Sequence, residues 1–355
     1  MDNIFNFSLM ELSNELKPSF RAKQVYNWLY KQYAVSYDEM TNLPKDLRQA
    51  LKDNYLLNPL KIVNKEVSID GTIKYLFKLY DGHFIESVFL FMKEKKRDET
   101  GKIVKSEQYT FCISTQVGCK MGCRFCLTAK GGFVRDLTAG EIVEQVRQIK
   151  IDNQIPANRS VNIVYMGMGE PLDNYDNLVR AIKIIAESEG LAISTKRQVI
   201  STIGNSTKIE QLGKDRLGVK LAISLHAVDD RLRTELIPVN KVYNISSIME
   251  AVRNFQANTR KKVTFEYLMI KRLNDDLESA AKLIRLLHGI KAKINLIYFN
   301  PYPGTIYQRP SKEQMLKFRK YLMDRGVTCT IRESRGLDIS AACGQLREKS
   351  NTKPA

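Results

Sequence analysis

Strands and helices are expected to alternate along the second half of the chain, and this alternation restricts the fold more than any other feature. Short apolar runs with the period of a strand recur between longer segments with the period of a helix. Repeated strand–helix units build a parallel sheet covered by helices, so we predict an α/β fold, closed as a barrel or left open. The expected strands lie at 161–165, 197–201, 219–225, 263–269 and 293–298, and the expected helices at 136–150, 174–189, 246–259, 275–289 and 312–325.

Polar residues and glycines follow the ends of these expected strands. Gly-Met-Gly-Glu occupies 167–170, Ser201 ends one strand, and His226 and Asn300 come just after two others. In parallel sheets the active site forms on the loops beyond the carboxyl ends of the strands. The sequence therefore predicts a site at that edge, although a two-glycine motif alone is also compatible with an ordinary strand-to-helix turn.

The first part of the chain has the pattern of a small helical module. Residues 1–55 carry helical periodicity, and a second short helix is expected near Pro44, which suits a first helical turn. Basic side chains lie among the apolar ones, so the module should have a basic surface. The apolar residues that can share a face are Phe20, Val25, Tyr26, Trp28 and Leu29, and the basic residues are Arg21, Lys23 and Lys31.

Between residues 60 and 115 the pattern becomes that of strands. Apolar runs at 74–80 and 84–91 are separated by Asp-Gly at 81–82, and the polar stretch 93–105 is expected to be a flexible hairpin connection. Glu86 interrupts the second run, and strand position alone does not decide whether it faces the core or solvent. If it is buried, its pKa is raised, which suits a base working near neutral pH.

Charge and composition indicate the partner and the compartment. The chain has 56 Lys and Arg against 39 Asp and Glu, a net charge of +17. Neutralising phosphates supplies most sequence-independent affinity, so nucleic acid is the expected partner. No run approaches the ~18 apolar residues of a membrane span, and the start does not read as a signal peptide. We therefore expect a cytoplasmic protein whose six cysteines bind metal or take part in catalysis.

Three of these cysteines form one compact motif. Cys119, Cys123 and Cys126 are spaced C-x3-C-x2-C. A structural zinc site has four protein ligands. A [4Fe–4S] cluster held by three thiolates instead leaves one iron free to bind a ligand that is not part of the protein. The alternative is a zinc-containing RNA-binding protein in which Cys112 supplies the fourth ligand. Its spacing from the triplet is long for such a site.

In their joint order these motifs resemble the RlmN/Cfr family of radical S-adenosylmethionine (SAM) RNA methyltransferases. The resemblance covers nearly the whole chain, including 20–25 and 39–44 in the helical module. It implies a partial (β/α)6 barrel with a helical domain at 1–57, a β extension at 58–106, a radical SAM core at 107–343 and a tail at 344–355. The similar segments of the core are 116–119, 166–172, 222–227, 300–304 and 338–346.

The resemblance also implies cofactors and their ligands. Cys119, Cys123 and Cys126 would bind the [4Fe–4S] cluster, whose open iron would chelate the amino and carboxylate groups of SAM. The glycines of the Gly-Met-Gly-Glu loop would let backbone come close to SAM. The residues that match the family's SAM contacts are Gly169, Glu170, Ser201, Ser224, Leu225, His226 and Asn300.

Three further residues match the family's reacting groups. Cys343 would be methylated by SAM and then carry the carbon to the base, and Cys112 would release the product by forming a transient disulfide with Cys343. Glu86 would accept a proton. Taken singly, both cysteines are equally compatible with buried small apolar residues. Cys329, which alternates like a strand residue, matches no motif and is assigned to packing.

The substrates implied by the resemblance are adenosine 2503 of 23S rRNA and, by extension, adenosine 37 of tRNA, both methylated at carbon 2. A carbon-8 methylase of the same family is the alternative, and Pro171 favours carbon 2, since that relative usually has alanine there. An unpaired or flipped base is expected. An electron donor such as flavodoxin or ferredoxin is implied, and a monomer is expected. Four residues could receive RNA phosphates, namely Lys120, Arg124, Lys130 and Arg135.

Overall fold

The computed structural model describes residues 1–93, 96–97, 103–105 and 107–347. Its amino-terminal part contains helices α1 (Leu9–Glu15), α2 (Phe20–Tyr30) and α3 (Lys45–Asn54), as the helical pattern predicts. Strand β1 (Asp2–Asn3) pairs in parallel with β2 (Tyr55–Leu56) and so brings the two ends of this module together. The predicted boundary after residue 57 falls between β2 and β3, and the division into four domains stays a prediction.

A ten-stranded sheet forms the centre of the molecule, in the order β16-β15-β14-β13-β12-β11-β8-β5-β4-β3. The strands from β8 to β16 are parallel, whereas β5, β4 and β3 are antiparallel additions at one edge. The parallel strands are β8 (Gln108–Cys112), β11 (Asn162–Tyr165), β12 (Gln198–Thr202), β13 (Lys220–Ser224), β14 (Val263–Met269), β15 (Ala292–Tyr298) and β16 (Cys329–Arg332). The antiparallel ones are β3 (Leu60–Val67), β4 (Ile73–Leu79) and β5 (Phe84–Lys93).

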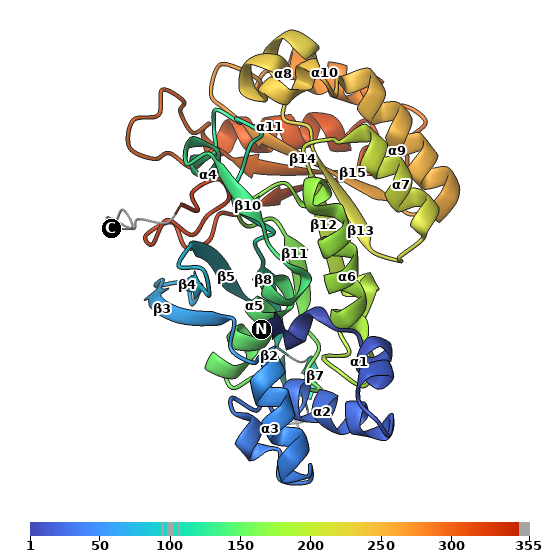
Figure 1. The fold of residues 1–355 in the computed structure, drawn as a ribbon. Coiled ribbons are helices and arrows are strands. Elements are labelled where there is room, and N and C mark those ends of the chain that lie inside the picture. Colours follow the sequence, from blue (N-terminus) through green and yellow to red (C-terminus); the bar gives the residue numbers. More distant parts are fainter. Residues whose placement is uncertain (94–95, 98–102, 106, 348–355) are drawn as a thin grey trace.

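Helices connect each parallel strand to the next, which gives six strand–helix units followed by a seventh parallel strand (Figure 1). This is the predicted alternation, and the described strands β16 and β3 are the two edges of an open sheet. Within the part of the chain that the structure describes, no helix could cross a membrane. The connecting helices are α5 (Ala139–Asp152), α6 (Tyr175–Ala186), α7 (Ser206–Asp215), α8 (Asp230–Leu236), α9 (Ile245–Thr259), α10 (Leu277–Leu286) and α11 (Lys312–Met323).

The helix expected from residue 136 starts later because the preceding residues form a strand. Strand β10 (Phe133–Asp136) pairs with β9 (Gln116–Gly118). Thr138 then caps α5 through a reciprocal pair of hydrogen bonds with Glu141. The predicted hairpin at 93–105 is represented by β6 (Lys96–Arg97) paired with β7 (Ile103–Lys105); residues 94–95 and 98–102 lie outside the described residues.

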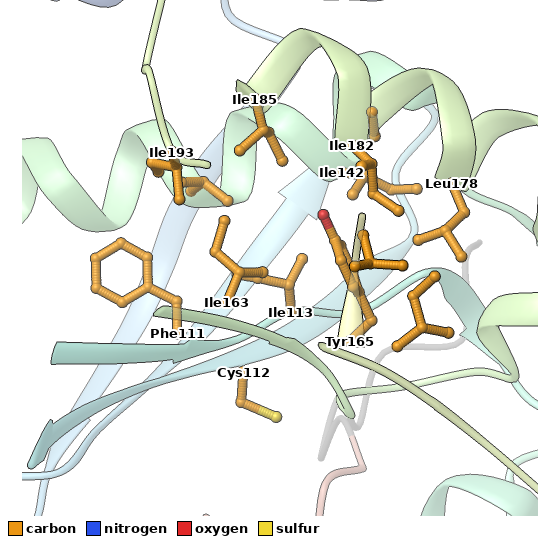
Figure 2. Close-up of a cluster of buried hydrophobic side chains, with 14 of the residues drawn as sticks. Phe111, Cys112, Ile113, Ile142, Ile163, Tyr165, Leu178, Ile182, Ile185 and Ile193 are labelled. Atoms are coloured by element: carbon orange, nitrogen blue, oxygen red, sulfur yellow. The ribbon is translucent and has the colours of Figure 1, made fainter. Parts of the chain in front are cut away.

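The hydrophobic core between the sheet and its helices fixes the direction of the side chains on β8. Phe111, Ile113, Ile163 and Tyr165 point toward α5 and α6 (Figure 2). Cys112 lies between two of these residues and points to the opposite face, because successive side chains of a strand alternate. The core packing therefore holds Cys112 on the inner face of the curved sheet.

The helical module is fastened to the rest of the molecule by a buried arginine. Arg147 of α5 donates from Nε to Leu29 O (2.8 Å) and from a guanidinium nitrogen to Ala34 O. Its other nitrogen donates to Glu144 Oε1 at 2.8 Å, and the guanidinium lies 5.2 Å from the centre of the Phe5 ring. Both members of this ion pair are fully buried. The module is thus docked on α5 by a buried polar contact as well as by apolar packing.

Candidate active site

The three cysteines of the triplet lie on the loop between β9 and helix α4 (Leu127–Lys130). The loop is held closed by Cys119 N–H donating to Gly132 O (2.7 Å) and Cys126 N–H donating to Cys123 O (3.1 Å). Gly118 has a φ of +75°, and a Cβ there would lie 2.0 Å from Gly132 O, so only glycine fits. All three cysteines line one cavity of about 160 Å³, called here the first cavity.

Residues at the carboxyl ends of the strands line the same cavity, as predicted. Gly169, Glu170, Ser201, Ser224 and His226 all border it and face the triplet. They come from β12, β13 and the loops after β11 and β13. The rule that places sites beyond the ends of parallel strands therefore correctly located Gly169, Glu170, Ser201 and His226, whereas Ser224 was expected from the family resemblance alone.

The Gly-Met-Gly-Glu loop is packed so tightly that its second glycine cannot be replaced. Gly169 has a φ of +100°, and a Cβ on it would lie 2.6 Å from Gln116 Cβ. Gln116 Oε1 also accepts a hydrogen bond from Glu170 N–H at 2.8 Å. The loop thus presents backbone, rather than a side chain, to the cavity at this point.

Glu170 is a buried carboxylate without a cationic partner among the described residues. Its Oε1 accepts from Leu172 N–H (3.1 Å) and its Oε2 from Ile203 N–H (3.0 Å). Burial raises its pKa to about 7 in spite of these hydrogen bonds. A cation bound in the first cavity would restore the charged form, so the site suits a ligand with an ammonium group.

His226 is held as a neutral ring. Its Nδ1 accepts from Leu268 N–H at 3.0 Å, and the ring makes an edge-to-face contact with Phe125 at 5.0 Å between centroids. Burial, with Arg233 nearby, lowers the pKa of His226 to about 3. Phe125 is the aromatic residue inside the cysteine triplet, so this contact joins the triplet loop to the end of β13.

A second cavity, of about 530 Å³, lies next to the first and is lined by the two cysteines that were expected to react. Cys112 and Cys343 both line it, and Cys343 also lines the first cavity. The triplet does not line the second cavity, nor Cys112 the first. The zinc alternative needs Cys112 beside the triplet, whereas Cys112 and the triplet line different cavities.

Two charged residues beside these thiols were missed by the sequence reasoning. Arg332, at the end of β16, and Glu266, in β14, line both cavities. Burial raises the pKa of the Cys112 thiol to about 12, and the Arg332 guanidinium opposes that rise. A polar residue inside an apolar strand was the available signal for Glu266, the same signal that singled out Glu86. Arg332 gave no comparable signal.

Glu86 is buried on β5, which removes the alternative that it faces solvent. Its Oε1 lies 3.6 Å from Lys74 Nζ, and its Oε2 has no hydrogen-bond partner among the described residues. Burial raises its pKa, while Lys74 opposes the rise. The backbone of Glu86 is joined to the Gly-Met-Gly-Glu loop, since Ser114 Oγ bonds both Glu86 O and Met168 N–H. Glu86 borders neither cavity.

The other predicted contacts lie outside the first cavity. Leu225 is buried in the hydrophobic core, with its N–H donating to Glu266 O at 3.1 Å. Asn300 lines the second cavity, and its Nδ2 donates to Cys343 O at 3.3 Å. Cys329 is buried in the core on β16, in agreement with its assignment to packing.

The four basic residues near the triplet differ in how they are engaged. Arg135 bonds Glu141 and Asp81, and Lys120 Nζ lies 3.0 Å from Asp173. Arg124 and Lys130 are exposed, and neither forms an ion pair with a described residue. Only these last two thus keep a charge that no described carboxylate neutralises.

The sequence matches two family models. Residues 113–284 match the Radical SAM superfamily. Residues 3–57 match the ribosomal RNA large subunit methyltransferase N-terminal domain.

Full-length relatives and a solved structure agree with these matches. A dual-specificity RNA methyltransferase RlmN of Aliarcobacter butzleri is 64% identical over 349 residues, 98% of this chain and 97% of that protein. One of Nitratiruptor is 61% identical over 351 residues, 99% of each chain. The crystal structure of a radical SAM methyltransferase from Sphaerobacter thermophilus superposes with a TM-score of 0.91 at 42% identity, covering 98% of this chain and 99% of that one.

Proposed function

The chain belongs to the RlmN family of radical SAM RNA methyltransferases, and on that basis we propose that it methylates carbon 2 of adenosine 2503 in 23S rRNA and of adenosine 37 in tRNA. The observation that carries the proposal is the position of Cys343, which lines both cavities, while Cys112 shares the second with it. One thiol can thus meet a methyl donor in the first cavity and a base in the second.

Members of the radical SAM superfamily use a [4Fe–4S] cluster and SAM, and the residues of the first cavity fit both. Cys119, Cys123 and Cys126 supply three thiols to one cavity, and iron binding would release their protons. Glu170 offers a buried carboxylate to the amino group of SAM, and Gly169 offers backbone. SAM bound at the cluster would supply a methyl group and, after one-electron reduction, an acceptor for a hydrogen atom.

Of the other matched SAM contacts, Ser201, Ser224 and His226 already border the first cavity. Asn300 would reach SAM only after its hydrogen bond to Cys343 O is released. Leu225 would contribute through its backbone, because its side chain is in the core. Each assignment follows the match to the family's motifs.

Cys343 would carry the transferred carbon. Its sulfur accepts the methyl group, the methyl group loses one hydrogen atom, and the resulting methylene bonds to carbon 2 of the adenine. Carbon 2 is not nucleophilic, so this radical addition replaces a polar transfer that has no reasonable path. The adduct would then lose the proton on carbon 2 and one electron, for which the cluster, oxidised when SAM was reduced, would be the acceptor. By its match to the family, Glu86 would accept that proton: its pKa is raised, and because it borders neither cavity, the adduct or Glu86 has to move for the transfer.

Cys112 would release the product. Its thiolate attacks the Cys343 sulfur, the disulfide forms, and the freed carbon takes up a proton to become the new methyl group. The thiolate is needed for this attack, but burial disfavours it. Arg332 lines the same cavity and favours the thiolate form. This nearby cation supports the proposed role of Cys112 as a thiolate.

The target base must leave its stack to reach Cys343, so an unpaired or flipped adenine is the expected substrate. The net charge of +17 suits RNA phosphates. Pro171 follows the Gly-Met-Gly-Glu loop and favours carbon 2 over carbon 8. We also propose that the chain works as a monomer in the cytoplasm and takes its electron from a flavodoxin or ferredoxin.

The direct test uses the reconstituted enzyme with labelled SAM, a reductant and either 23S rRNA or tRNA. Mass spectrometry of the nucleosides should find methyl groups at carbon 2 of adenosine in both RNAs. Methylation at carbon 8 would overturn the assignment of the position, and labelling of only one RNA would overturn the dual substrate.

A further inference from the structure

A third hollow, the outer groove, lies on the far side of the cysteine loop. It has a volume of about 310 Å³ and is bordered by the cysteine loop, the end of α4 and the segment between β15 and α11. Figure 1 shows that segment beside α4. Cys123 and Ala129 line both this groove and the first cavity, so this part of the wall between the proposed cluster position and the surface is one residue thick.

The floor of the outer groove is aromatic and rigid. Tyr302 and Tyr307 are buried, and both rings pack on Phe299, at 6.2 and 5.8 Å between centroids. Tyr302 Oη donates to Arg124 O at 2.9 Å, which ties this floor to the cysteine loop. A surface of this kind is formed before any partner arrives, so docking on it costs little ordering entropy.

The rim of the groove is basic and carries an exposed apolar residue. Arg124 and Lys130 are exposed, and Lys130 Nζ lies 4.7 Å from the centre of the Tyr302 ring. None of the described residues that line the groove is acidic, and Ile306 at its edge is 86% exposed. An apolar centre with a charged rim is typical of an interface with another protein. RNA phosphates are bound by polar and basic groups, so they would not account for the exposed Ile306.

We propose that the outer groove is the docking site of the electron donor, a small acidic protein that carries one electron. This proposal extends the proposed function and rests on it, because an electron delivered at the groove needs a cluster bound by Cys123 as its acceptor. RNA has to reach the second cavity, where Cys112 and Cys343 lie, and that cavity shares no lining residue with the outer groove. A small interface suits the brief encounters of redox partners.

Binding is the first readout. Flavodoxin should bind the reconstituted chain, and the double variant Arg124→Glu, Lys130→Glu should weaken its Kd at least tenfold at low salt. The matched control is Arg285→Glu, Lys317→Glu, which makes the same charge change on the exposed faces of α10 and α11. The Kd for RNA should be equal in the two variants within twofold. Unchanged flavodoxin binding, or a selective loss of RNA binding, would overturn the proposal.

The second readout separates the electron supply from the chemistry. Ile306→Asp should lower methylation driven by flavodoxin at subsaturating donor about tenfold, and it should leave methylation driven by dithionite within twofold of the parent. Equal loss with both reductants, or no loss with either, would contradict the docking site. The binding titration needs no product, so a chain that methylated another position would fail the proposed function and still leave the docking test intact.

Discussion

Cys343 lies between the two cavities of the active site, and Cys112 lines the second of them from the end of β8. Cys112 ends the first parallel strand, β8, whereas Cys343 lies after the last one, β16, and Arg332 lies beside both thiols. This arrangement is what a carbon carrier and a resolving thiol require, since one must reach two places and the other only one.

Removing each thiol should give a different result. Cys343→Ala should abolish methylation and leave no protein–RNA species, because the carbon carrier is gone. Cys112→Ala should accumulate RNA covalently bound to the protein, because the adduct cannot be resolved. Denaturing gels and intact mass spectrometry distinguish these outcomes. Cys329→Ala, in the core, is the matched control and should retain methylation. Free methylated product from Cys112→Ala would contradict the scheme.

Replacing the proposed base should slow product formation without preventing RNA binding. Glu86→Gln should lower the rate by about 10²–10⁴-fold, the usual contribution of a positioned base. Because burial raises its pKa, the parent's rate should rise with pH through that pKa as the carboxylate forms. The variant should lack this rise of the rate with pH. Glu66→Gln is the control, since Glu66 also pairs with Lys74 (2.9 Å) but is partly exposed. Equal rates in all three proteins would exclude a role for Glu86.

Arg332→Met should raise the pKa of Cys112, because the guanidinium favours its thiolate. Resolution of the adduct should therefore slow at neutral pH and should recover as the pH rises. The decay of the trapped species, measured against pH, reports this shift. Arg335→Met removes a cation from the wall of the same cavity and should leave the pH dependence of this decay unchanged. A uniform loss at every pH in Arg332→Met would indicate a structural role instead.

Arg147→Met should destabilise the protein and loosen its helical module. The change leaves Glu144 buried without its partner, and breaking a buried pair costs about 3–5 kcal/mol. Urea unfolding measures the loss, and amide exchange in α2 should increase because Leu29 O loses its donor. The double variant Arg147→Met, Glu144→Met should recover part of the stability. No change in either measurement would mean that apolar packing alone holds the module.

The spacing of apolar residues along the chain predicted the helices and strands, and with them the edge of the sheet at which the site forms. Glu170, Ser201 and His226 could be located because parallel strands end at one edge, and the periods of the apolar residues mark where those strands end. The helix expected from residue 136 was placed too early, since the pairing of β10 with β9 depends on a loop closure that no local pattern records.

Contacts between distant segments could not be read from the sequence. Arg332 faces the two thiols because β16 pairs with β15, and its residue type gives no sign of this. Arg147 likewise reaches carbonyls of the helical module that are distant in the chain. Asn300 was expected at SAM, but it bonds the turn that carries Cys343. In each case the partner is set by tertiary packing.

In the proposed mechanism the new methyl group passes through Cys343 as a methylene. The most direct measurement uses SAM with a trideuterated methyl group and determines the mass of the methyladenosine. One deuterium should leave as the hydrogen atom removed from Cys343, and one solvent proton should enter when Cys112 resolves the adduct. The methyladenosine should therefore carry a methyl group with two deuterium atoms and one hydrogen. A methyl group that keeps all three deuterium atoms would show direct transfer and would contradict it.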